Sequence, residues 1–204
     1  MQAPGIGCAP AYVGNPGPLN RPPHHRDSVV IGVDPGAHGA LALIVGGTLV
    51  AVEDMPVITV KGGPDRLVFT KDGTPARRHS IRHRISAGLI ANLLASWQED
   101  WGGVDHVFLE QVHAHRDDSA ASAFTFGRST GEVVGVVSAL RIPLTEVPPQ
   151  RWKTRMGCDS DKKKSLARIR ALFPNALRFF DRVKDEGRAE AALIGVYGSY
   201  ILGE

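Results

Sequence analysis

Apolar residues occur along the chain in short runs that end at turn-forming residues, and runs of this length predict β-strands. The predicted strands cover residues 29–34, 40–45, 48–53, 104–110 and 142–147. Gly46-Gly47 separates the second run from the third, and a Gly-Gly pair between two strands indicates a tight hairpin. The first three strands should therefore meander, and the other two should follow intervening helices.

Apolar residues three and four positions apart predict helices in the rest of the chain. In residues 81–97 the repeat is Ile81, Ile85, Leu89 and Leu93. Further helices are expected over residues 119–140, in basic segments from about 150 to 172, and over about 188–202. Residues 55–80 show no clear period and predict a long loop. This order of elements indicates an α/β protein with a five-stranded mixed sheet and helices on both faces.

The composition fits one soluble domain after a short leader. The chain has 204 residues, of which 43% are hydrophobic and 22% charged. Residues 1–27 are rich in Pro and Gly and predict a disordered leader, so the domain should span residues 28–204. No apolar run approaches the roughly 20 residues of a membrane helix. Cys8 and Cys158 are far apart, which favours a reducing compartment and argues against a disulfide framework or a structural zinc site.

Positive charge is concentrated in two segments, although the net charge is only +3. Residues 151–170 contain eight Lys or Arg and two acids, and residues 71–84 contain five Lys or Arg and one acid. One such segment is most often a solvated surface, but two in a small domain favour a polyanionic partner such as nucleic acid.

Three acidic positions suggest a metal site. Asp34 and Glu110 each end an otherwise apolar strand, and strand ends at one side of a sheet can lie next to each other. A third acidic group, Asp185-Glu186 with Glu190, stands at the start of the last helix. Taken alone, each acid has an ordinary explanation as a turn former or a helix-dipole partner. Together, clustered carboxylates need a cation, and oxygen ligands without Cys or His favour Mg²⁺ or Mn²⁺.

Several segments in this order resemble the RuvC-like Holliday-junction resolvases of the ribonuclease H-like superfamily. They read GVDPGAHGALAL, FLEQV, FGRSTGEVVG, VPPQRWK followed by DKKKS, and VKDEGRAEAALIGVYG. The resemblance covers about residues 29–202 and is strongest to the plant-chloroplast and phage or bacterial branch. It implies a ribonuclease H-like fold and a homodimeric endonuclease that nicks four-way DNA junctions symmetrically. It also implies two Mg²⁺ (or Mn²⁺) ions per active site, with no small-molecule cofactor and no membrane partner.

The resemblance assigns roles to particular acids. Asp34 matches the first catalytic, metal-binding acid, Glu110 the second and Glu190 the last. The remaining ligand matches Asp185, which lies five positions before Glu190. On an ideal helix, however, residues five apart point about 140° away from each other, whereas residues four apart share a face. Helix geometry thus supports Glu186 instead. Asp185 still fits if the helix begins after it, so we favour Asp185, as the resemblance indicates, and keep Glu186 as the alternative.

The resemblance also places basic and aromatic residues on DNA. Lys162 matches a lysine near the scissile phosphate and is expected to be catalytic, although a solvated basic run is the ordinary alternative. The remaining expected DNA-binding residues are Arg77, Arg78, Arg82, Arg84, Phe126, Arg151, Trp152, Lys153, Lys163 and Lys164. Phe126 and Trp152 are candidates for stacking on unpaired bases, although single aromatic residues more often belong to a core. Gly127, Gly131 and Gly135 form a smooth stripe, for which close packing is the favoured interpretation.

Three other functions are open to such a sequence. GVDPGAHGALAL also resembles the phosphate loop of sugar kinases and actin-like ATPases, but these need a second similar domain that a chain this short does not provide. Another ribonuclease H-like nuclease, acting on RNA–DNA hybrids or as a transposase, would share the acids. A catalytically silent junction-binding protein is disfavoured because every acid position is filled. If the chain comes from a bacterium or a phage, we expect a cytoplasmic, nucleoid-associated location; organellar targeting stays open.

Overall fold

The protein is described by a computed structural model that covers residues 27–62, 66–78, 81–113, 119–182 and 184–203. The leader predicted over residues 1–27 lies outside this range except for its last residue. The central sheet has five strands in the order β3-β2-β1-β8-β9. They are β1 (Val29–Asp34), β2 (Ala40–Val45), β3 (Thr48–Asp54), β8 (His106–Glu110) and β9 (Leu144–Val147). β1, β8 and β9 are parallel and β1, β2 and β3 antiparallel, so the predicted mixed sheet is confirmed.

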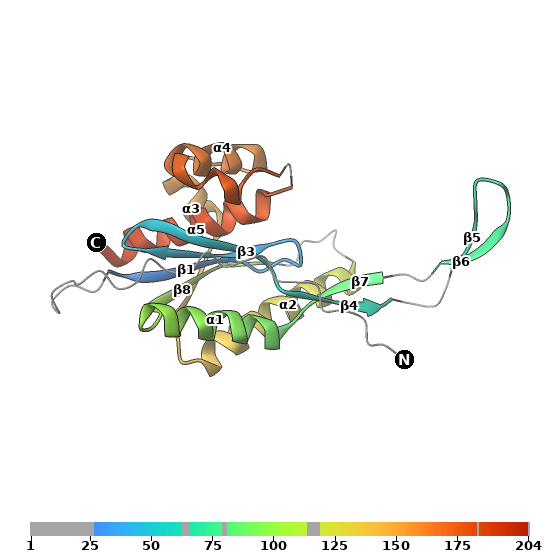
Figure 1. Ribbon diagram of the computed structural model, residues 1–204, viewed down its shortest axis with the longest axis horizontal. Helices are drawn as coiled ribbons and strands as arrows, with labels where there is room; N and C mark the ends of the chain where they lie inside the picture. Colours follow the sequence, from blue (N-terminus) through green and yellow to red (C-terminus); the bar gives the residue numbers. More distant parts are fainter. Residues whose placement is uncertain (1–26, 63–65, 79–80, 114–118, 183, 204) are drawn as a thin grey trace.

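Helices cover both faces of this sheet, as predicted (Figure 1). They are α1 (Ala87–Trp101), α2 (Ala120–Ala139), α3 (Pro149–Met156), α4 (Lys162–Leu172) and α5 (Glu186–Gly203), with a short 3₁₀ helix over Pro174–Phe179. α1 and α2 lie on one face, and α5 lies on the other beneath α3 and α4. No helix in the described ranges is long and apolar enough to cross a membrane.

Alternate residues of β1 enter two different cores, which explains why the whole strand is apolar. Val29, Ile31 and Val33 pack with α1 and α2, whereas Val30 packs with α5. Gly32 lets α5 approach very closely, because a Cβ at this position would lie 2.1 Å from the carbonyl oxygen of Ala191. At the other end of β2, Gly46 and Gly47 form the predicted hairpin, both with positive φ.

Two expectations about the segment before α1 are wrong. Residues 55–80 are not a loop without structure, since β4 (Val57–Lys61), β5 (Arg66–Phe69) and β6 (Pro75–Arg78) lie within them. The expected helix over residues 81–97 begins with β7 (Ile81–Ile85), which pairs with β4, and the helix starts only after Ser86. Isoleucines four positions apart suit a helix and a strand equally, which is why the spacing misled.

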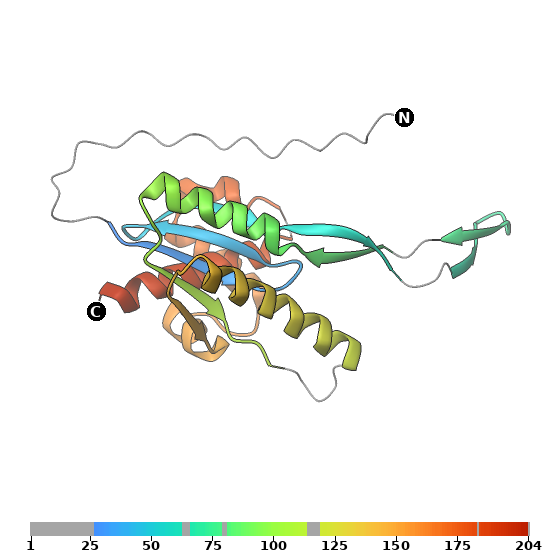
Figure 2. The same cartoon turned by 90° about the horizontal axis from the view of Figure 1, so that it is seen from below.

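These four strands form two ribbons, β4–β7 and β5–β6, that together make an arm extending from the sheet (Figures 1 and 2). The predicted loop is therefore a projection. Its inner ribbon, β4–β7, leads back to the end of β3 and the start of α1.

Candidate active site

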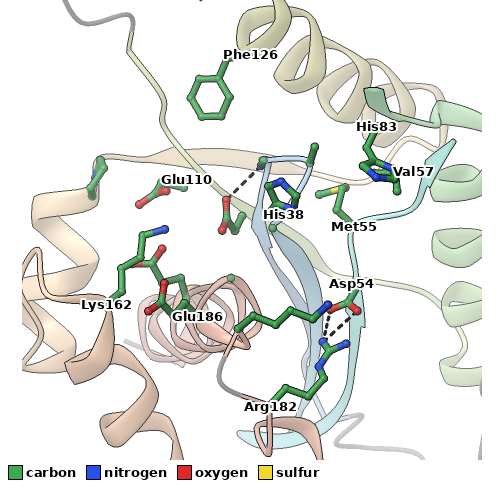
Figure 3. Close-up of a pocket in the computed structure, with 18 of the residues that line it drawn as sticks. His38, Asp54, Met55, Val57, His83, Glu110, Phe126, Lys162, Arg182 and Glu186 are labelled. Atoms are coloured by element: carbon green, nitrogen blue, oxygen red, sulfur yellow. Dashed lines mark hydrogen bonds and ion pairs between the residues drawn. The ribbon is translucent and has the colours of Figure 1, made fainter. Parts of the chain in front are cut away.

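Asp34 and Glu110 come together because the two strands that carry them are parallel neighbours. Val33 pairs with Leu109, so the acids that end the two strands lie side by side at one edge of the sheet. Both line one cleft, in which Glu110 is visible in Figure 3. The predicted convergence of the two strand-end acids is confirmed.

Glu190 joins them from the second turn of α5. It is 3% exposed and lines the same cleft. Gly187, one turn earlier, lets the helix reach this position, since a Cβ there would lie 2.4 Å from the carbonyl oxygen of His38 and 3.3 Å from Asp34 Oδ2. Three carboxylates from distant parts of the chain therefore share one largely buried space.

Burial and mutual repulsion perturb these acids. Burial raises the pKa of Asp34 to about 6, with the charge of Glu190 adding to the effect and the N–H of Gly36 opposing it. Burial likewise raises the pKa of Glu110 to about 7, with further contributions from the charges of Asp34 and Glu190. Carboxylates that repel one another in a buried site create a demand for positive charge.

Two lysines supply part of that charge. Lys153 Nζ of α3 lies 3.0 Å from Glu190 Oε1. Lys162 begins α4, and its charge lowers the pKa of Asp34. Asp161 caps this helix by accepting the N–H of Lys163, so Lys162 is held at the rim of the cleft (Figure 3). Lys153 was expected to bind DNA, and the structure places it among the acids.

Trp152 is not placed for stacking on DNA. It is fully buried, and its Nε1–H donates to Glu110 Oε1 at 3.1 Å. The expectation that it meets unpaired bases is therefore wrong, because the indole is part of the core that supports Glu110. Phe126, by contrast, is 39% exposed and lines the cleft from α2, as Figure 3 shows.

The two candidates for the remaining acid have different surroundings. Glu186 lines the cleft (Figure 3). The side chain of Asp185 is fully buried, and both its oxygens accept hydrogen bonds from Arg182. Asp185 is absent from the cleft lining among the described residues. The geometry therefore favours Glu186, the alternative, as the acid that faces the cleft.

The donor set fits hard divalent cations. In the described part of the chain, no group of three or more Asp, Glu, His or Cys side chains is arranged so that it could hold a metal ion. Glu190 Oε1 is nevertheless buried and accepts no well-aligned hydrogen bond, although Lys153 Nζ lies 3.0 Å from it. A buried carboxylate oxygen beside two further acids suits Mg²⁺ or Mn²⁺, which prefer oxygen ligands.

The other predicted DNA-binding residues lie on exposed surfaces or at the edge of the description. Arg82 and Arg84 are exposed on β7, and Arg151, Lys163 and Lys164 are exposed on α3 and α4. Lys164 is ion-paired with Asp159. Arg77 and Arg78 belong to β6, but their side chains lie outside what the structure describes.

The sequence analysis missed several residues of the cleft. They are His38, Asp54, His83, Arg182 and Lys184. Asp54 carried a usable signal, because it ends β3 just as Asp34 ends β1. Asp34 pairs with Ala40 and Ala40 pairs with Asp54, so the three positions form a row across the sheet.

The fold is similar to that of RuvC. Thermus thermophilus RuvC, solved in complex with a Holliday junction substrate, matches with a TM-score of 0.50 and 16% sequence identity, over 86% of this chain and 96% of that one. The yeast mitochondrial Holliday junction resolvase Ydc2 matches with a TM-score of 0.46 and 13% identity, over 84% of this chain and 78% of that one. No model of a protein family matches the chain.

One curated relative has detectable sequence similarity. The chain is 30% identical over 154 residues to the chloroplastic Holliday junction resolvase MOC1 of Chlamydomonas reinhardtii. The alignment covers 72% of this chain but only 17% of that protein. The predicted resemblance to RuvC-like resolvases, and to the chloroplast branch among them, is confirmed.

Proposed function

We propose that this protein is a metal-dependent endonuclease that cuts four-way DNA junctions. The observation that carries the proposal is the cleft in which Asp34, Glu110 and Glu190 converge beside Lys153 and Lys162. Acids that hold cations, next to ammonium groups that attract phosphate, are the groups that phosphodiester hydrolysis requires. The resemblance to junction resolvases supports the choice of substrate.

Asp34, Glu110, Glu190 and Glu186 are the residues that would hold two Mg²⁺ or Mn²⁺ ions. When bound, such ions activate water and stabilise the leaving oxygen of an in-line displacement. Trp152 holds Glu110 through its indole N–H, and the strands fix the backbone of both strand-end acids. The chain itself therefore keeps the carboxylates in place before any DNA arrives, which is the preorganisation that catalysis requires.

Basic residues extend from the cleft in two directions that DNA can follow. Lys162 stands at the rim of the cleft, and Lys163 is exposed beside it on α4. On the other side His83 lines the cleft from β7, and Arg82 and Arg84 of the same strand are exposed on the arm. Phosphate contacts along both would position the substrate without reading its sequence.

We further propose that the protein acts as a homodimer through α2. The first half of this helix is exposed, with Phe124 at 72%, and a Cβ on Gly127, Gly131 or Gly135 would meet no atom within 4 Å. The favoured interpretation of this glycine stripe, close packing, is therefore not met inside one copy of the described chain. A second copy related by a two-fold axis would cover the stripe and present two sites to the paired strands of a junction.

A substrate panel tests the proposed activity. The protein is incubated with a labelled four-way junction, a linear duplex and an RNA–DNA hybrid, each with Mg²⁺ or with a chelator. We expect nicking of the junction only in the presence of Mg²⁺, with 5′-phosphate and 3′-hydroxyl products. Asp34→Asn and Glu110→Gln should bind the junction without cutting it.

Matched controls come from α1, on the opposite face of the sheet from α5. Asp100→Asn and Glu99→Gln remove exposed carboxylates of the same kinds and should cut like the wild-type protein. Preferential cutting of the hybrid would instead assign the protein to another ribonuclease H-like activity. Junction binding without cutting under any metal would indicate a catalytically silent binding protein.

A further inference from the structure

A cluster of four charged residues lies at one side of the acidic cleft, and two of them, Asp54 and Arg182, line it. Asp185 precedes α5, Arg188 belongs to its first turn, and Arg182 comes just before them. The fourth member, Asp54, ends β3 and is distant in sequence. The cluster thus joins the start of the last helix to the edge of the sheet that also carries Asp34.

Asp185 is the buried centre of this cluster. Its side chain is 0% exposed, and Arg182 donates to it twice, from the backbone N–H at 2.8 Å and from Nε at 2.6 Å. Arg188 Nε lies 3.7 Å from the same carboxylate. Both carboxylate oxygens have a donor, so Asp185 has little remaining capacity to bind a metal.

The two arginines carry the connection from Asp185 to the sheet. Arg182 Nη2 donates to both oxygens of Asp54, at 2.8 and 3.0 Å, and Arg188 Nε donates to Asp54 Oδ1 at 2.5 Å. Burial acts to raise the pKa of Asp54, but the hydrogen bonds from Arg188 and Arg182 outweigh it and hold the pKa at about 2. Asp54 therefore stays ionised in any physiological buffer, and the bridge persists.

The same elements place the acids of the cleft. Glu186 directly follows Asp185, and Glu190 stands two positions after Arg188. The two glutamates are four positions apart and so lie on one face of α5. Gly187 between them packs against the turn after β1. A shift of the helix start would therefore move two carboxylates relative to Asp34.

We propose that Asp185 is a positioning residue rather than a metal ligand. With Arg182, Arg188 and Asp54 it seats the start of α5 so that Glu186 and Glu190 face the cleft. The inference rests on the proposed metal-dependent function, and it changes which acid of the Asp185-Glu186 pair binds the ion. Groups that orient metal ligands typically contribute 10- to 100-fold to metal affinity, although they never touch the ion.

The test compares Asp185→Asn with Glu186→Gln by two measurements made without DNA. Mn²⁺ affinity is measured by isothermal titration calorimetry, and the melting temperature is measured in a chelator. Asp185→Asn should weaken Mn²⁺ binding by roughly 10- to 100-fold and lower the metal-free melting temperature. Glu186→Gln should weaken Mn²⁺ binding without lowering that temperature, because it removes a charge from a repelling group.

A third variant guards against a simple folding failure. Asp54→Asn removes a half-exposed carboxylate at the far end of the cluster and should weaken Mn²⁺ binding in the same direction as Asp185→Asn. The double variant should be no weaker than Asp185→Asn alone, because both act through one network. Asp159→Asn, which breaks the exposed pair with Lys164, is the matched control and should bind Mn²⁺ like the wild-type protein.

Cleavage at rising Mn²⁺ concentration supplies a further discriminating readout. High Mn²⁺ should restore junction cutting by Asp185→Asn, since only the affinity is impaired, but should not restore cutting by Asp34→Asn. Two results would overturn the proposal. One is loss of Mn²⁺ binding in Asp185→Asn with an unchanged or higher metal-free melting temperature, which marks a direct ligand. The other is wild-type Mn²⁺ affinity in both Asp185→Asn and Asp54→Asn.

Because affinity and melting are measured without DNA, this inference and the proposed function fail separately. A wild-type protein that binds Mn²⁺ but cuts no junction would contradict the proposed function without contradicting the positioning role of Asp185.

Discussion

Replacing Asp34 by Asn should stabilise the metal-free protein at alkaline pH. The pKa of Asp34 rises from 3.8 to about 6 on folding, so the folded state holds its proton more tightly than the unfolded chain. The stabilisation that follows is fully present below pH 3.8 and is lost as the pH rises through about 6. At pH 8 the ionised carboxylate thus costs up to about 3 kcal/mol, at 1.36 kcal/mol per pKa unit.

Asparagine removes this charge while keeping the carbonyl oxygen that accepts the N–H of Gly36 at 3.2 Å. For a domain of this size each kcal/mol shifts the melting temperature by roughly 2–4 °C. We therefore expect Asp34→Asn to melt up to about 10 °C above the wild-type protein at pH 8 in a chelator, with a difference roughly half as large at pH 5. Added Mn²⁺ should raise the melting temperature of the wild-type protein more than that of the variant.

Differential scanning calorimetry at pH 5 and pH 8 measures both differences, with Asp100→Asn as the control that changes neither. A metal-free Asp34→Asn protein that melts at or below the wild-type temperature at pH 8 would refute the reasoning. In that case the ionised Asp34 side chain would not destabilise the metal-free protein.

Three further predictions follow from the site. Mn²⁺ affinity measured by calorimetry should increase from pH 5 to pH 8, because Glu110, with a pKa of about 7, must lose its proton to bind a cation. An affinity that does not change with pH would contradict this. Trp152→Phe keeps a buried aromatic ring but removes the N–H donor to Glu110, so it should weaken Mn²⁺ affinity by roughly 10-fold with little change in junction affinity. Unaltered Mn²⁺ binding would show that Trp152 does not orient Glu110. Lys162→Ala should lower the single-turnover cleavage rate more than it lowers junction affinity. Lys164→Ala should mainly reduce the slope of log affinity against log salt, by about one. If both variants behave like the wild-type protein, the lysines at the start of α4 are only a solvated surface.

The acids at strand ends were predictable because a charged side chain is unexpected at the end of a strand that is otherwise apolar and buried. A strand as apolar as Val29–Asp34 has no packing reason to end in a carboxylate, and the same holds for His106–Glu110. Parallel pairing then brings the two ends together, which the order of elements already indicated. The central sheet and its helices were predictable for the same reason, since burial on both faces leaves a clear apolar pattern.

The arm was not predictable, because its strands bury too little to leave a pattern. Four of the five residues of β7 are exposed, and β4 is only partly covered. Pairing in such ribbons depends on backbone hydrogen bonds, which any sequence provides. The four-residue spacing of Ile81 and Ile85 continues into α1, and for this reason a helix was predicted where β7 lies.

The choice between Asp185 and Glu186 depended on contacts that a linear sequence does not contain. Spacing on an ideal helix favoured Glu186, and the resemblance favoured Asp185. Arg182 donates to both oxygens of Asp185, and Arg182 is itself bound by Asp54, which is distant in the chain. Trp152 illustrates the same limit, since neither its burial nor its bond to Glu110 could be read from neighbouring residues.

Cutting of a supercoiled plasmid that extrudes a cruciform tests the central claim most directly. A junction endonuclease with two coupled sites converts this plasmid to linear DNA, whereas an unspecific nickase leaves open circles. With Mg²⁺ we predict linear product from the wild-type protein and from Asp100→Asn, and none from Asp34→Asn. Linear product from Asp34→Asn at the wild-type rate, or no junction-dependent cutting by the wild-type protein, would contradict the account.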